Sequence, residues 1–193
     1  MLGYSVYHGL LSLSLTYLVA ITVYNYGLSK SPLLKNPLSG FGYFCSTWGS
    51  MYIIGHNQPL STVSAHSAFA SWLTYAVTGH AQDFRDRSGD VLMGRKTIPL
   101  IFSQRVARGY LICALFGTTC GLIKLWSPPP SVIYVFTFLC LGTSMRFAML
   151  RTEEEDEINY VCYAVWLILA HFLPIFGRVD VWNTYLTAHF RGE

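Results

Sequence analysis

The chain has 193 residues, of which 52% are hydrophobic and only 12% are charged, and its mean hydropathy is +0.38. A soluble domain carries about 25% charged residues, so this composition excludes an ordinary soluble domain and predicts a protein with several membrane spans. The formal net charge of +3 is spread along the chain without basic runs interleaved with aromatic residues, which gives no support to nucleic-acid binding.

Six apolar segments approach the roughly 20 residues that a membrane-spanning helix needs. In chain order they are residues 4–26, 38–54, 60–79, 106–123, 132–150 and 158–176. The second and third are short and rich in small residues, which is typical of helices that pack closely against their neighbours. The segments predict an all-α membrane protein, a bundle of about six transmembrane helices that forms a single domain over residues 1–193.

A dense charged cluster follows the third segment, where residues 82–100 read QDFRDRSGDVLMGRKTIPL. Asp83, Asp86 and Asp90 stand at positions i, i+3 and i+7, which share one face of a helix. Carboxylates on one face can hold Mg²⁺ and leave coordination sites for water and phosphate oxygens. Such an ion neutralises charge on a diphosphate leaving group. Taken alone, the spacing favours a plainer interpretation, a solvated and self-neutralising loop between two membrane helices.

Cations and aromatic residues near this cluster supply the candidate substrate contacts. Arg95 and Lys96 are expected to contact phosphate directly, with Arg85 as a further candidate. Tyr75 and Trp72 lie about one to three turns from the carboxylates, where ring faces would stabilise an allylic cation. The alternative is that these rings only pack helices together or form an interfacial belt.

The longer string D-x-x-D-x-x-G-D-x-x-x-G-R-K-T-I-P-L, which begins at Asp83, resembles the second aspartate-rich motif of the UbiA family of intramembrane prenyltransferases. The resemblance includes Gly89, Gly94 and the exit at residues 97–99. It implies Mg²⁺ as the cofactor and a prenyl diphosphate as the substrate. It also implies one set of residues as both metal ligands and catalytic residues: Asp83, Asp86 and Asp90.

The resemblance covers only part of the family's fold. Full-length members have nine membrane helices and two facing aspartate-rich motifs, and this chain resembles the fourth to ninth helices. The first motif, Asn/Asp-x-x-x-Asp, has no counterpart, because residues 1–82 contain no Asp or Glu. Three explanations stay open: an N-terminally truncated piece of a longer enzyme, a short form that works with one metal cluster or completes its site as a homo-oligomer, or a degenerate copy without catalysis.

The positions of the cations predict which way the bundle faces. Nine lie in loops on one side and three on the other, so the positive-inside rule places the aspartate-rich loop on the cytoplasmic side. The nine are Lys30, Lys35, Arg85, Arg87, Arg95, Lys96, Arg105, Arg108 and Arg151, and the three are Lys124, Arg178 and Arg191. The acidic run at residues 153–157 is expected to be a solvated helix start, capped by Thr152.

These features together predict a Mg²⁺-dependent prenyltransferase that moves a prenyl group from an isoprenoid diphosphate to an acceptor. Residues 35–48 and Gln82 are most similar to members of fungal secondary-metabolite pathways, which indicates terpenoid or meroterpenoid biosynthesis. A membrane-bound terpene cyclase, in which the substrate's own double bond captures the cation, is the alternative within the family. A non-catalytic membrane protein that keeps the loop but not the site is the alternative from another class.

Overall fold

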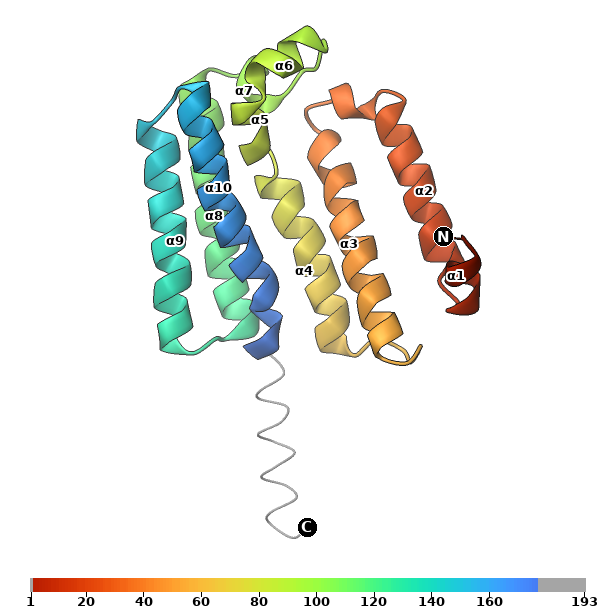
Figure 1. Cartoon of the computed structure of the whole chain (residues 1–193). Coiled ribbons are helices and arrows are strands. Elements are labelled where there is room, and N and C mark those ends of the chain that lie inside the picture. Colours follow the sequence, from red (N-terminus) through yellow and green to blue (C-terminus); the bar gives the residue numbers. More distant parts are fainter. Residues whose placement is uncertain (1, 177–193) are drawn as a thin grey trace.

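The computed structural model describes residues 2–176, and every regular element in this range is a helix. Three short helices cap one end of a row of long helices (Figure 1): α5 (Ala81–Arg85), α6 (Arg87–Leu92) and α7 (Ile98–Ile101). The long helices lie side by side: α2 (Leu11–Asn25), α3 (Lys35–Ile54), α4 (Thr62–Thr78), α8 (Gln104–Trp126), α9 (Pro130–Met149) and α10 (Glu153–Phe172). The predicted fold class, an all-α membrane bundle, is confirmed.

Three of the long helices have the length and composition of a membrane span. They are α8, α9 and α10 continued to Phe176, with mean hydropathies of 1.5, 1.6 and 1.7. Helix α2 is apolar but shorter. The five predicted segments from residue 38 onward each correspond to one long helix, with ends that differ by a few residues.

The first predicted segment, residues 4–26, is wrong as a single helix. The chain forms α1 (Leu2–Tyr7), breaks, and starts again as α2. The break is a Schellman motif, in which the Leu10 amide donates to the Ser5 carbonyl at 2.7 Å and the Gly9 amide donates to the Val6 carbonyl at 3.1 Å. Gly9 has a φ of +69°, a left-handed conformation that glycine adopts without a steric penalty.

Small residues let α3 and α4 approach closely, as their composition predicted. A Cβ placed on Gly40 of α3 would lie 2.9 Å from the carbonyl oxygen of Trp72 on α4. The Trp72 indole nitrogen donates to the Pro37 carbonyl at 2.9 Å, which ties the same two helices together. The Trp72 side chain therefore takes part in the contact between α3 and α4.

We expect Gly40→Ala to destabilise the protein by about 1–3 kcal/mol, because the added methyl group has no space against the α4 backbone. Gly109→Ala in α8 is the matched control, since nothing lies within 4 Å of its Cβ and alanine is the better helix former. Thermal unfolding of the detergent-solubilised protein measures the difference. Equal melting temperatures for the Gly40 variant and the unmodified protein would contradict the close contact.

The loop end of the bundle is joined to the main core through α5. Phe84 of α5 is fully buried and packs against Phe147 of α9 with ring centroids 5.6 Å apart. Deeper in the core, Phe136 stacks on Trp166 at 5.6 Å. Because α5 shares this core, packing helps to hold Asp83 of α5 and the two aspartates that follow it.

Candidate functional site

The three aspartates lie at one end of the bundle but not on one continuous helix. Asp83 belongs to α5 and Asp90 to α6, and the helix breaks between them at Asp86, with φ −102° and ψ 15°. Just past the break, the Ser88 amide donates to a Glu153 carboxylate oxygen of α10 at 2.7 Å. The prediction of a single helical face is therefore wrong, because contacts to α10 hold the chain where a straight helix would continue.

A buried lysine from α3 lies between two of the aspartates. The Lys35 ammonium is 2.6 Å from Asp83 Oδ1 and 3.7 Å from Asp90 Oδ2. The side chains of Lys35, Asp83 and Asp90 are 10%, 2% and 1% exposed. Burial raises the pKa of Asp83 to about 6, although the Lys35 ammonium acts in the opposite direction. The sequence predicted Lys35 only as a basic residue of a loop, because its acidic partner Asp83 lies 48 residues away.

Charged groups also line a pocket of about 360 Å³ that Asp90 of this buried cluster borders. Arg95 donates to Asp90 Oδ1 at 3.0 Å, and Asp86, with a side chain 42% exposed, lies 3.4 Å from Arg85 Nε. Lys96 does not line this pocket; it is exposed, and its backbone amide donates to the Lys30 carbonyl. The pocket is lined by Arg85, Asp86, Ser88, Gly89, Asp90, Met93 and Arg95.

The carboxylate oxygens of the buried residues Asp83 and Asp90 are suitable ligands for a cation. Asp90 Oδ2 is buried and accepts no hydrogen bond in the structure, and Asp83 shares the same ammonium partner. Two buried carboxylates with one unsatisfied oxygen are hard oxygen ligands of the kind that Mg²⁺ takes. Within residues 2–176, however, no three His, Cys, Asp or Glu side chains gather as a metal-binding group. In the described part of the chain, the cations that pair with these two carboxylates are Lys35 and Arg95.

Aromatic rings lie directly beside this cluster. Tyr75 donates from its hydroxyl to Gln82 Oε1 at 3.3 Å and stacks on Tyr43 of α3, with centroids 4.8 Å apart. The Arg85 guanidinium lies over the Tyr160 ring at 4.0 Å. The structure thus places Tyr75 near the aspartates. Trp72, the other predicted cavity ring, instead packs between α3 and α4 and lines a different pocket with Pro37.

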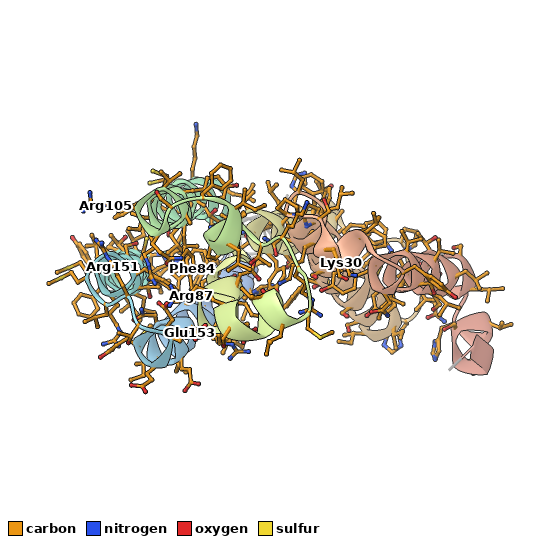
Figure 2. All side chains as sticks on the ribbon, turned by 90° about the horizontal axis from the view of Figure 1, so that it is seen from above. Lys30, Phe84, Arg87, Arg105, Arg151 and Glu153 are labelled. Atoms are coloured by element: carbon orange, nitrogen blue, oxygen red, sulfur yellow. The ribbon has the colours of Figure 1, made fainter. Side chains whose placement is uncertain are left out.

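A second buried charge cluster anchors the loop to the ends of α8 and α10. Asp156 is fully buried and accepts from both terminal nitrogens of Arg108, at 2.6 and 2.9 Å. Arg87 lies 3.3 Å from Asp156 and donates to Gln104 at 2.7 Å. Figure 2, which looks onto this end of the bundle, shows Arg87 and Glu153 where α6 meets α10. The cluster fixes the chain just after Asp86.

The acidic run therefore differs from its prediction at one position. The Thr152 cap is confirmed, because its hydroxyl accepts from the Glu155 amide at 3.2 Å. The expectation that the whole run is solvated is wrong for Asp156, since the charges of Arg108 and Arg87 compensate for its burial. Arg146 of α9 donates to Asn159 and Glu155 of α10, at 3.0 and 3.3 Å. These bonds tie α9 to α10.

Comparison with known proteins identifies the family to which the chain is similar. The chain matches the profile of the UbiA prenyltransferase family over residues 1–175. It is 39% identical over 176 residues to fumagillin beta-trans-bergamotene synthase of Aspergillus fumigatus, which covers 91% of this chain and 61% of that protein. It is 32% identical over 106 residues to somaliensene A/B synthase of Streptomyces somaliensis, which covers 51% of this chain and 35% of that protein. The search of solved structures gave no significant match.

Proposed function

This chain belongs to the UbiA prenyltransferase family, and from that premise we propose that it contributes the aspartate-rich loop of a membrane enzyme that ionises an isoprenoid diphosphate. The observation that carries the proposal is the buried cluster of Lys35, Asp83 and Asp90, of which Asp90 lines a pocket together with two arginines. These buried charges are paired with one another, and the pocket that Asp90 shares with Arg85, Asp86 and Arg95 offers both guanidinium groups for an anion and carboxylates for a cation.

Each residue has a proposed role in that site. Asp83, Asp86 and Asp90 would hold Mg²⁺, which when bound supplies charge neutralisation for the diphosphate. Arg85 and Arg95 line the pocket and donate N–H bonds to phosphate oxygens. Lys96 follows Arg95 in the chain but does not line the pocket. We therefore propose only a contact with phosphate at the edge of the site for Lys96.

The chemistry that follows is cleavage of the carbon–oxygen bond of the prenyl diphosphate, with the electron pair leaving on the diphosphate. The resulting allylic cation needs a dry environment and electron-rich surfaces. Tyr75, Tyr43 and Tyr160 provide ring faces close to the aspartates, and cation–π attraction favours a positive charge over such rings. Trp72 keeps only its helix-packing role in this proposal.

We favour cyclisation as the fate of that cation, because the two curated relatives described above are both named as terpene synthases. In that reaction the substrate's own double bond attacks the cation, and loss of a proton gives a cyclic hydrocarbon. Prenyl transfer to a separate acceptor, which the sequence alone favoured, is the second candidate, since the matching family profile is that of prenyltransferases. Product analysis without any added acceptor separates the two: a cyclic hydrocarbon supports cyclisation, and turnover only with an acceptor supports transfer.

The chain spans 61% of the length of its Aspergillus relative. The activity in that relative's name belongs to the whole of that protein, and it is proposed here for this chain. It is an integral membrane protein, and we propose that the aspartate-rich loop faces the cytoplasm. The basic residues Lys30, Arg87, Arg105 and Arg151 lie at the same end of the bundle as this loop (Figure 2), which supports that orientation. Arg178 and Arg191, which entered the charge comparison, lie outside the described residues.

We expect Arg95→Gln to raise the KM for the prenyl diphosphate by about tenfold, because a charged hydrogen bond to phosphate contributes roughly 1.5–3 kcal/mol. Steady-state kinetics of diphosphate release from membranes that contain the protein measure this change. Arg105→Gln is the matched control, since Arg105 is exposed and pairs with no carboxylate in the described part of the chain. An unchanged KM for the Arg95 variant would remove Arg95 from the site.

A further inference from the structure

A small enclosed cavity lies between α4, α8 and α10, toward the end of the bundle opposite the aspartate-rich loop. The centre of a water molecule can occupy a volume of about 10 Å³ inside this cavity. This volume is close to the minimum that one bound water needs. The cavity lining combines apolar and polar side chains: Ser67, Ala70, Ser71, Thr74, Leu122, Trp126, Ala170, His171 and Pro174.

Two of the lining residues carry complementary hydrogen-bonding atoms that no described residue pairs. Trp126 Nε1–H can only donate, and it is buried without a partner among the described residues. His171 Nδ1 lies 2.7 Å from the Leu167 carbonyl oxygen, which can only accept, so Nδ1 carries the proton. In the neutral ring Nε2 is therefore an acceptor, and it too is buried without a partner.

Three hydroxyl groups on α4 complete the polar lining. Ser67, Ser71 and Thr74 are each less than 10% exposed. Each of the three residues lines the cavity, and each hydroxyl can both donate and accept a hydrogen bond. The cavity thus gathers at least one donor, one acceptor and three groups that can do either.

We propose that this cavity binds one structural water, which accepts from Trp126 Nε1–H, donates to His171 Nε2 and completes its bonds with the α4 hydroxyls. A buried polar group without a partner is costly, and a cavity that is polar and large enough is the setting in which an ordered water removes that cost. The water joins three helices within the membrane-spanning part of the bundle. It also orients the His171 ring, which lies 5.4 Å from the Tyr43 ring of α3.

The test uses the indole N–H signals of the protein in detergent micelles, labelled with ¹⁵N at tryptophan. We expect a rotating-frame Overhauser cross-peak between water and the Trp126 indole proton. Trp166 is the internal control, because its indole nitrogen already donates to Thr119 Oγ1 at 3.1 Å and it is fully buried. A cross-peak at Trp166 as strong as that at Trp126 would indicate general solvent penetration and would overturn the proposal, as would its absence at Trp126.

A pair of substitutions at one cavity position separates bound water from a poorly packed region. Ser71→Val adds bulk where the water would sit, so we expect the Trp126 cross-peak to disappear while the indole signal remains. Ser71→Ala leaves the space open, and we expect the cross-peak to persist. Loss of the cross-peak in the alanine variant with retention in the valine variant would contradict a water in this cavity.

Discussion

Asp90→Asn is expected to lower metal-dependent diphosphate release by about 100-fold or more, the range seen when one charge-stabilising group is removed from an active site. The amide matches the carboxylate in size but carries no charge. It cannot balance both Lys35 and Arg95, which lie 3.7 and 3.0 Å from the Asp90 carboxylate. Release of diphosphate from farnesyl diphosphate by membranes that contain the protein measures the effect.

Glu154→Gln is the matched control for that substitution. It makes the same charge change at the same end of the bundle, but Glu154 is exposed and contacts no partner among the described residues. We expect the control to keep activity within about twofold of the unmodified protein, as for a surface change. Should the Asp90 variant also stay within that range at equal expression, Asp90 would not belong to the reaction site.

Asp156→Asn is expected to destabilise the protein by about 3–5 kcal/mol, because it leaves the buried Arg108 guanidinium without a counter-charge. Arg108 is 2% exposed, and its other bonds go to backbone carbonyls, which cannot neutralise it. For a domain of this size the loss corresponds to a fall in melting temperature of roughly 10 °C. Thermal unfolding in detergent measures it.

The control for Asp156 is Glu157→Gln, the next residue in α10, which is exposed and carries the same charge. Its melting temperature is expected to stay close to that of the unmodified protein, since surface changes usually alter stability by less than about 0.5 kcal/mol. Equal melting temperatures for both variants would mean that the Arg108–Asp156 pair is not buried as described.

The helices were predictable because hydropathy and length determine membrane spans directly. The predicted segment 106–123 lies within α8, which runs from Gln104 to Trp126. The break in the first segment was not predicted, since Gly9 looks like any other glycine in an apolar run until its left-handed conformation is seen. Sequence patterns report the length of an apolar stretch better than they report interruptions within it.

The clustering of the candidate site residues was predictable where they are neighbours in the chain; their function stays a prediction. Their spacing in the sequence pointed to the three aspartates and Arg95. In the structure, one pocket is lined by Arg85, Asp86, Asp90 and Arg95. The spacing did not point to Lys35, whose contact with Asp83 spans 48 residues. Nor did it distinguish Asp156 from the acids around it, because only the packing of α8 against α10 selects which carboxylate meets Arg108.

Release of diphosphate from farnesyl diphosphate by membranes that contain the protein tests the proposed Mg²⁺-dependent ionisation. The measurement is made with Mg²⁺ and with the ion removed by a chelator, and products are analysed without added acceptor. We expect release that requires Mg²⁺ and is lost when Asp83, Asp86 and Asp90 are all replaced by alanine. Release that is equal with and without Mg²⁺, or equal in the triple variant, would contradict the proposal.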